Sequence, residues 1–336
     1  MLLLRAIVAL GLAGLVHGAA AAQSTSKLTI VIGYTPGAAY DIYARTVARH
    51  IGKHLPGNPA VIPQNMAGAG SLKAANFLFT NAAGDGTTIG TFARGLPMQP
   101  LLDNTGIQFD ARRFNWIGSP SAEVSVVFSW HTTPFKTIAD IQSRQMIVPA
   151  TGSGANSAIF PFVLNSVIGT KFKVVMGYPG QAETMLAIER GEADGSAGSS
   201  WSYVASAKKE WLADRRINLI SQVAFKPHPD LHNVPLVMDS ASDEAGRKVL
   251  ELIFSRQMMA YPFVAPPGVP QDRVVALRKA FDAMMKDPEY LADANRQQLE
   301  VDPVSGAEIE NMVKSAYANP PEIIARAKAA LQEGRN

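Results

Sequence analysis

The clearest pattern of apolar and polar positions lies in residues 29–55. A short β-branched run over Thr29–Ile32 is typical of a buried strand, and it ends at Gly33. After the turn that follows, apolar residues recur at helical spacing, which predicts an amphipathic helix with one buried face. The residues of that face are Ala44, Val47, Ala48, Ile51 and Leu55. We therefore expect a strand, a tight turn and a helix in succession.

The turn between this strand and this helix is a candidate anion site. Pro36 fixes φ and Gly37 can take a positive φ, so the chain can reverse over Tyr34–Ala39. The first N–H groups of a helix have no acceptor within the helix, and together with the helix dipole they favour an anion such as a carboxylate. We expect Asp41, in the first turn, to cap such groups, because its charge would oppose a bound anion.

Two further strand units follow, and they predict the start of a parallel sheet. Residues 59–63 and 87–92 have the composition of strands, and a helix capped by Ser71 is expected between them. In open α/β sheets the loops after the strands line the ligand crevice, so the loops of this unit should converge. They are Tyr34–Ala39, Gln64–Gly70 and Phe92–Gly95.

The pattern then repeats in a second α/β unit with its own small polar loop, Thr151–Asn156. Extended segments near residues 118–130 and 217–223 would join the two units. Two crossings predict a discontinuous first domain and a cleft that can close about a hinge. The predicted division is residues 27–122 plus 224–336 for the first domain and 123–223 for the second. Within the second, strands are predicted at 146–150, 172–176 and 195–198, and helices at 138–142, 157–168 and 182–190.

The first residues have the features of a secretory signal peptide. Arg5 gives a basic start, Ile7–Val16 an apolar core, and Ala20–Ala22 small residues for cleavage. The apolar run is shorter than the ~20 residues that a spanning helix needs. We expect cleavage after residue 22, with an uncleaved anchor as the alternative. The mature chain would keep roughly 310 residues, enough for two domains.

Composition narrows the classes of function. The chain has no Cys, so it has no disulfide framework. Charged residues make up 18% and the net charge is +3, which is too weak and too dispersed to indicate a nucleic-acid partner. His50 and His54 have a spacing that can hold a metal ion, but no third ligand is evident, and a solvated helix face is favoured. We expect no metal and no cofactor.

No catalytic constellation is recognisable. There is no G-x-S-x-G motif, and Ser153 in its Gly-Ser-Gly loop is more typical of a turn or hydrogen-bonding residue than of a nucleophile. Arg94 directly follows a predicted strand, where it can pair with a ligand carboxylate or form a surface salt bridge. Tyr34, Tyr178 and Trp201 can wall a pocket or belong to the core. The sequence thus favours binding over catalysis.

Several short motifs resemble, in their order and spacing, those of one family over nearly the whole mature chain. They are Tyr34-Thr35-Pro36-Gly37 with Asp41, Asn65–Gly70, Gly84–Thr87, Thr151–Ser157, Tyr178–Gly180 with Gly191–Asp194, and Phe263–Pro270. The family is that of the periplasmic substrate-binding receptors of tripartite tricarboxylate transporters, also called Bug-type receptors.

This resemblance implies an α/β type II periplasmic-binding fold, with two lobes, a hinge and an interdomain cleft. It implies a receptor without enzymatic activity that captures a small organic carboxylate in the periplasm and delivers it to integral-membrane permease subunits. A monomer is expected, with no nucleic-acid partner. Two alternatives stay open, namely a co-receptor for a membrane sensor kinase and an enzyme on the same fold.

The resemblance also places one ligand carboxylate between the first loop and the loop of the second domain. The residues concerned are Tyr34, Gly37, Ala38, Ala39, Thr151, Gly152, Ser153 and Asn156. Further candidate ligand-binding residues are Asn65, Gly68, Arg94, Tyr178, Asp194, Ser199 and Trp201.

Three positions depart from the family pattern. Ala38 and Ala39 replace glycines, so a positive φ there would cost energy. Ala158 and Gly198 stand where the family has a His and an Asp, and Asp194 is expected in a turn. We therefore expect the far half of the pocket to differ from that of the family.

Overall fold

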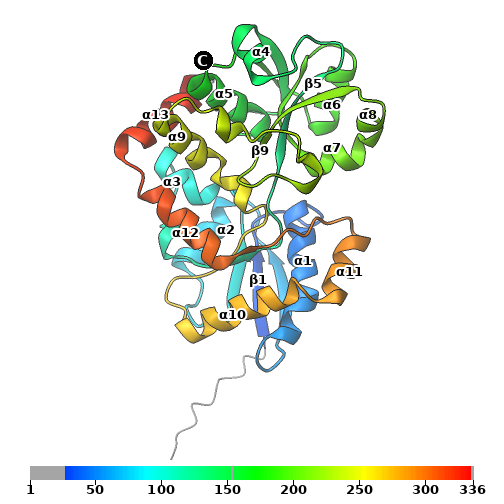
Figure 1. Cartoon of the computed structure of the whole chain (residues 1–336). Coiled ribbons are helices and arrows are strands. Elements are labelled where there is room, and N and C mark those ends of the chain that lie inside the picture. The colour runs from blue at the N-terminus through cyan, green and yellow to red at the C-terminus, as the bar shows by residue number, and fades with distance from the viewer. Residues whose placement is uncertain (1–26, 153, 334–336) are drawn as a thin grey trace, which may run out of the picture.

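Two α/β lobes, one above the other in Figure 1, make up the molecule. The computed structural model describes residues 27–152 and 154–333. The predicted signal peptide, residues 1–22, lies outside the described residues. None of the helices in the described ranges has both the length and the apolar character needed to cross a membrane.

The first lobe is built on a six-stranded mixed sheet of order β11-β4-β10-β3-β1-β2. Strands β2, β1 and β3 are parallel, which confirms the predicted start of the sheet. Strand β10 is antiparallel to both β3 and β4 and lies between them, although it comes late in the chain. The strands are β1 (Lys27–Ile32), β2 (Ala60–Asn65), β3 (Thr88–Thr91), β4 (Asn115–Ser119), β10 (Phe263–Ala265) and β11 (Val304–Ser305).

Helices cover this sheet, and α1 shows how their faces are chosen. Ala44, Val47 and Ile51 of its predicted apolar face are fully buried. The α-helix ends at Ile51 and passes into a short 3-10 turn, so Leu55 lies just beyond it and is still buried. The helices of this lobe are α1 (Ala39–Ile51), α2 (Leu72–Thr80), α3 (Gln99–Leu102), α10 (Gln271–Met284), α11 (Pro288–Arg296) and α12 (Gly306–Tyr317).

The second lobe contains a three-stranded antiparallel sheet, β8-β5-β9, and a parallel pair, β6-β7. Asp194 joins the two, because its N–H donates to the Ile147 carbonyl (2.9 Å) and its carboxylate accepts from the Ile147 N–H (2.7 Å). The strands are β5 (Ser125–Trp130), β6 (Met146–Ala150), β7 (Phe172–Met176), β8 (Gly195–Ser200) and β9 (Ile217–Val223). The helices are α4 (Ile138–Ser143), α5 (Asn156–Ile168), α6 (Gln181–Glu189), α7 (Trp201–Ala207) and α8 (Lys209–Ala213).

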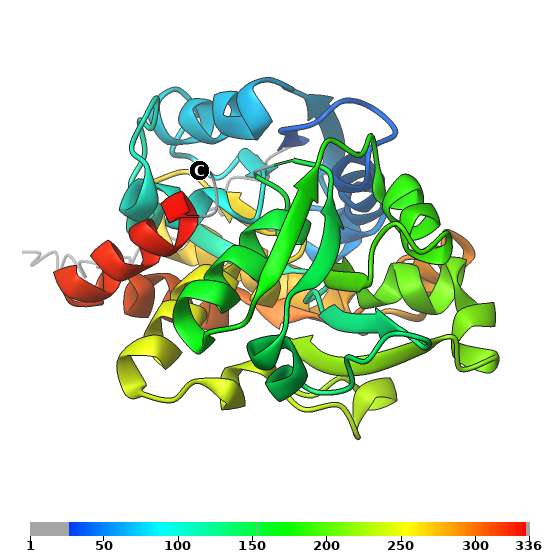
Figure 2. The same ribbon diagram turned by 90° about the horizontal axis from the view of Figure 1, so that it is seen from above.

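The chain passes between the lobes twice at one end of the antiparallel β5–β9 pair, where Ser125 is paired with Val223. It enters between Ser119 and Ser125 and leaves after Val223. Two later helices, α9 (Glu244–Phe254) and α13 (Pro321–Glu333), pack against α5 of the second lobe. In Figure 2, α13 (red) lies beside α9 (yellow-green), which it contacts. Segments beyond residue 223 therefore contact both lobes.

Candidate functional site

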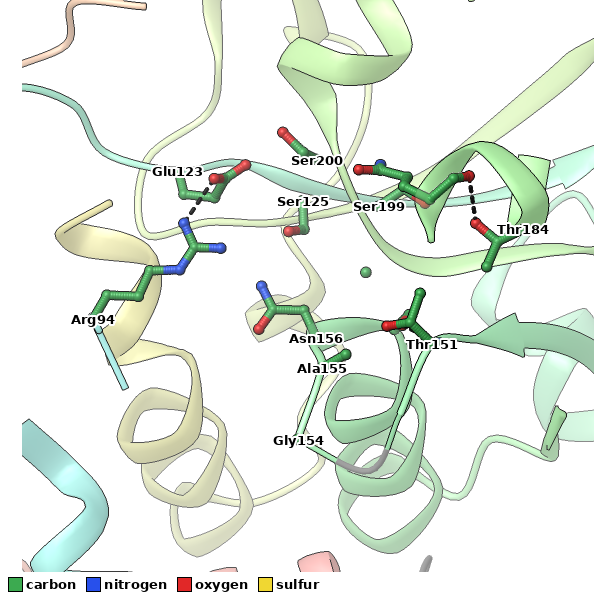
Figure 3. Close-up of a pocket in the computed structure, with 13 residues that line it drawn as sticks. Arg94, Glu123, Ser125, Thr151, Gly154, Ala155, Asn156, Thr184, Ser199 and Ser200 are labelled. Atoms are coloured by element: carbon green, nitrogen blue, oxygen red, sulfur yellow. Dashed lines mark hydrogen bonds and ion pairs between the residues drawn. The ribbon is translucent and has the colours of Figure 1, made fainter. Parts of the chain in front are cut away.

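A cavity of about 280 Å³ lies where the two lobes meet (Figure 3). The first lobe contributes Arg94, and the first crossing contributes Glu123 and Ser125. The second lobe contributes the rest of the wall from three places: the loop before α5, the start of α6 and the end of β8. These residues are Thr151, Gly154, Ala155, Asn156, Ser157, Gln181, Thr184, Gly198, Ser199 and Ser200.

The first turn of α5 faces this cavity. Its N-cap, Ala155, has extended backbone (φ −80°, ψ 152°) and no side chain that can cap the helix. The first N–H groups of α5 have no acceptor within the helix, and the helix dipole adds positive potential there. The surrounding side chains of Ser125, Thr151 and Ser199 carry hydroxyl groups. This end of the cavity can therefore donate hydrogen bonds to an anion.

Arg94 and Glu123 form an ion pair on the opposite wall. Nη1 of Arg94 lies 2.7 Å from Oε2 of Glu123, and the two side chains are 22% and 13% exposed. Burial opposes the charge of Arg94, but the Glu123 carboxylate, together with Tyr40 and Tyr261, raises the pKa of the guanidinium. The N–H of Arg94 also donates to the Tyr40 hydroxyl (3.0 Å). The sequence left open whether Arg94 pairs with a ligand carboxylate or forms a salt bridge. The structure shows Arg94 in a partly buried salt bridge at the cavity.

The first loop adopts the predicted turn without strain at its alanines. Gly37 has φ +83°, whereas Ala38 has φ −72°. Asp41 accepts a hydrogen bond from the Gly37 N–H (2.9 Å), in keeping with a capping role. Asn65 donates to the Tyr34 carbonyl (2.9 Å) and to Asp41 (2.7 Å). Asn65 therefore braces the loop from β2.

The cavity brings together four of the predicted site residues, namely Arg94, Thr151, Asn156 and Ser199. Other predicted residues are not among those that line it: Tyr34, Gly37, Ala38, Ala39, Asn65, Gly68, Gly152, Tyr178, Asp194 and Trp201. Ser153 lies outside the described residues.

Some of these other residues have structural contacts instead. Tyr34 stacks on Tyr40, with ring centroids 4.4 Å apart. Trp201 is buried, and its ring lies edge-on to His228 at 6.2 Å. Asp194 forms the strand-joining contacts given above. The expected convergence of the first loop with the loop before α5 is thus not seen in the lining of this cavity.

Several lining residues were not predicted from the sequence. Glu123 and Ser125 lie on the first crossing, and Thr184 lies in the first turn of α6, where its hydroxyl donates to the Gln181 carbonyl (2.7 Å). Gly198 has φ +122°, and a Cβ there would lie 2.7 Å from the Asn156 carbonyl oxygen. The run of small residues at the end of β8 was the one available signal, because it permits this close approach to α5.

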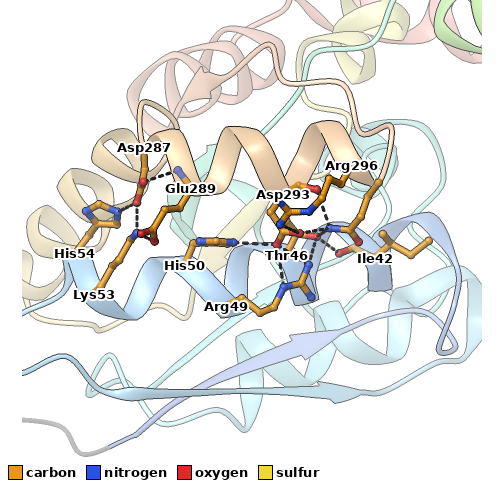
Figure 4. Close-up of polar contacts among 11 residues, drawn as sticks. Ile42, Thr46, Arg49, His50, Lys53, His54, Asp287, Glu289, Asp293 and Arg296 are labelled. Carbon is orange, nitrogen blue, oxygen red and sulfur yellow. Dashed lines mark hydrogen bonds and ion pairs between the residues drawn. The ribbon is translucent and has the colours of Figure 1, made fainter.

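The solvated helix face that the sequence favoured for His50 and His54 is wrong, because both side chains are partly buried against α11. Nε2 of His50 lies 2.9 Å from Asp293 on α11, and Nε2 of His54 lies 2.9 Å from Asp287, the N-cap of that helix (Figure 4). In the described part of the chain, no group of three or more metal-ligating side chains is placed to hold an ion.

Solved structures of solute-binding proteins share this fold. No protein-family model and no curated protein matches the chain. Solved structures do match: a TctC solute-binding protein from Polaromonas, without ligand, has a TM-score of 0.71 at 17% identity, covering 91% of this chain and 98% of that one. The predicted type II periplasmic-binding fold is confirmed.

Two further similar structures were solved with ligands. A Rhodopseudomonas palustris protein with adipate has a TM-score of 0.59 at 17% identity, covering 90% of this chain and 97% of that one. MatC from the same species, with bound malate, has a TM-score of 0.56 at 17% identity, covering 91% and 98%. At these identities the likeness establishes the fold.

Proposed function

We propose that this chain is a periplasmic solute-binding receptor that holds a small organic carboxylate in the cavity between its lobes. The observation that carries the proposal is the first turn of α5, which faces a hydroxyl-lined cavity at the junction of the lobes. The backbone N–H groups of such a turn can bind an anion even where no positively charged side chain contacts it. The similar structures that hold adipate and malate support the same class of ligand.

The Arg94–Glu123 pair sets a condition on the ligand. Because Glu123 already neutralises Arg94, an incoming carboxylate must share the guanidinium or approach it from its free edge. The N–H donors of α5 then hold the anion from the other wall. Contacts from both lobes to one ligand favour a closed arrangement, which is how a ligand shifts the balance between lobe positions.

We further propose that the protein acts without catalysis and delivers its ligand to a tripartite tricarboxylate-type membrane permease. The two-lobed fold and its similarity to a TctC protein support this role. The basic and apolar pattern of residues 1–22 supports export to the periplasm. A pull-down with membrane extract, with and without carboxylate, tests the partner, and a permease that is retained only with ligand is the expected result.

The binding proposal is tested by thermal unfolding of the mature protein with a panel that includes malate, succinate, adipate and benzoate. A ligand of the native state at a hundredfold excess over Kd adds about 2.7 kcal/mol of stability, which raises Tm by several degrees. We expect at least one carboxylate to do so, with a Kd in the micromolar range, about −8 kcal/mol. A panel without any shift would contradict the proposal.

A matched pair of variants ties that shift to the cavity. Thr151→Val removes a hydroxyl that lines the cavity at nearly constant volume, whereas Thr132→Val makes the same change at an exposed position that does not line it. We expect Thr151→Val alone to weaken binding, by roughly fivefold to tenfold. Equal Kd values for the two variants would place the ligand elsewhere.

A further inference from the structure

A second chamber adjoins the first and differs from it in chemistry. It has a volume of about 390 Å³, and Gly154 lines both chambers. Its walls are largely apolar and come from both lobes: Leu96, Met98, Leu102, Ile159, Leu252 and Ile253. Gln99, Asp103 and Arg256 are the charged or amide side chains at it. A chamber of this size and composition is typical of sites for small molecules with an apolar body.

Arg256 is a cation without a partner in this chamber. Among the described residues it makes no ion pair, and its Nε is a buried donor with no acceptor. Arg94, by contrast, is paired with Glu123. Burial and the neighbouring charge of Arg94 lower the pKa of Arg256 to about 10, so it stays protonated at neutral pH. A buried charge that lacks a counter-ion is costly, and a ligand anion would relieve that cost.

Gly95 makes the room that Arg256 occupies. A Cβ at position 95 would lie 2.1 Å from Nη2 of Arg256 and 3.0 Å from its Cζ. Gly95 has φ −82°, a backbone conformation that any residue can adopt, so the conformation does not require a glycine here. Its lack of a side chain instead lets the guanidinium of Arg256 pack against the backbone that follows Arg94. Arg94 thus lines the first chamber, and Gly95 next to it leaves space for the guanidinium of Arg256.

We propose that Arg256 holds the carboxylate of the ligand, and that the apolar chamber beside it holds an alkyl or aryl body. This inference rests on the proposed function and narrows it from small carboxylates in general to amphiphilic monocarboxylates. The carboxylate lies beside Gly154, where the two chambers meet, between the guanidinium of Arg256 and the N–H groups of the first turn of α5. The body lies against Met98, Leu102 and Ile253. The hydroxyl-lined chamber next to Gly154 then receives any polar substituent of the ligand.

The test compares three probes by isothermal titration calorimetry on the mature protein: hexanoate, its neutral isostere hexanamide, and the polar dicarboxylate succinate. We expect wild-type protein to bind hexanoate at least tenfold more tightly than either of the others. Arg256→Gln should weaken hexanoate by roughly tenfold to a hundredfold and leave hexanamide unchanged, because only the charged probe uses the guanidinium. Arg247→Gln, an exposed arginine on α9, is the control.

A second variant keeps the inference testable if Arg256→Gln does not fold. Gly95→Ala adds only a methyl group, which displaces the end of the Arg256 side chain, and it should weaken hexanoate in the same direction. Succinate binding with no hexanoate preference, or hexanoate binding that both variants leave intact, would overturn the inference while the proposed function stands. Failure of all carboxylates to bind would overturn the proposed function as well.

Discussion

Nε2 of Gln257 donates a hydrogen bond to Oγ of Ser125 over 2.9 Å, and this contact ties the two crossings between the lobes together. The same Nε2 also donates to the Val223 carbonyl at 3.3 Å. The backbone carbonyl of Gln257 accepts from the Glu123 N–H at 2.8 Å. Oε1 of Gln257 accepts from Asn156 at 3.3 Å. One buried amide therefore connects the start of β5, the end of β9 and the first turn of α5.

Replacing Gln257 with Leu should lower the free energy of unfolding by roughly 2–4 kcal/mol. The side chain is 1% exposed, so the change leaves buried polar groups of Ser125 and Val223 without their partner. Urea unfolding followed by circular dichroism measures the effect. Gln271→Leu is the control, since Gln271 is exposed at the start of α10, and it should stay within about 0.5 kcal/mol of wild type. Equal urea midpoints for the two variants would show that the side-chain hydrogen bonds of Gln257 add no stability.

Much of the fold could be predicted because its strands are short apolar runs between turn residues. The bounds predicted for β6, β7 and β9 agree with the structure. The position of β10 could not be predicted, because pairing with β3 and β4 joins segments far apart in the chain. Ser71 illustrates a similar limit: it was expected to cap α2, but it has φ +71° and its hydroxyl accepts from the Ala93 N–H (2.7 Å).

The candidate site was less predictable than the fold. Arg94 could be found because it follows a predicted strand at the edge where α/β sheets bind ligands, whereas Thr151 and Asn156 were found through the family resemblance of their loop. Glu123 and Arg256 carry no such local signal. Glu123 matters because it pairs with Arg94. Arg256 matters because it packs against Gly95 without an ion pair among the described residues. Both contacts join segments that are far apart in the chain.

Glu123→Gln should tighten carboxylate binding, by roughly tenfold, and lower Tm. Removing the carboxylate frees the Arg94 guanidinium for the ligand and takes away a negative charge at the cavity. The fold loses an ion pair at the same time, and leaving one charge of a partly buried pair alone is destabilising. Calorimetry with the best carboxylate of the panel and thermal unfolding without ligand measure the two effects separately.

Glu310→Gln is the control for this experiment. Glu310 pairs with Arg278 at 2.6 Å in the first lobe, with exposures of 29% and 23%, and does not line the cavity. It should lower Tm without changing Kd. Weaker binding by Glu123→Gln would mean that Glu123 itself contacts the ligand, for example by accepting a hydrogen bond from it.

Glu300 should make the protein less stable as the pH rises from about 4.5 to 7. Burial, with the nearby charge of Glu123 as the next cause, raises the pKa of this carboxyl to about 7. Between the ordinary pKa and the raised one, the folded state holds a proton that the unfolded state has lost, so raising the pH favours unfolding. Glu300→Gln should remove this slope and be more stable than wild type at pH 8. Urea midpoints at pH 5 and pH 8 measure it.

Glu192→Gln serves as the comparison for Glu300, because Glu192 is exposed in the turn after α6. Its pH profile should parallel that of wild type. A Glu300→Gln protein that keeps the wild-type slope would show that another group titrates in this range.

Asp293→Asn should destabilise the protein at neutral pH by roughly 1–2 kcal/mol, and the difference should vanish near pH 2. Asp293 joins α11 to α1 through contacts of 2.9 Å with both Arg49 and His50 (Figure 4). Burial alone would raise the pKa of this carboxyl, but the hydrogen bonds from His50 and Arg49 lower it to about 2. A lowered pKa contributes stability that is present above the ordinary value near 4 and is lost as the pH falls toward 2.

Urea unfolding at pH 7, 4 and 2 measures this convergence, with Asp272→Asn at an exposed position of α10 as the control. The wild-type curve should fall toward that of Asp293→Asn as the pH drops, while the control follows wild type throughout. Asp287 lies on the same face, where the hydrogen bond from Lys53 is the main cause that lowers its pKa. An Asp293→Asn curve that stays parallel to wild type down to pH 2 would mean that the contacts of Asp293 act through packing, because a charge-based contribution must disappear once the carboxylate is protonated.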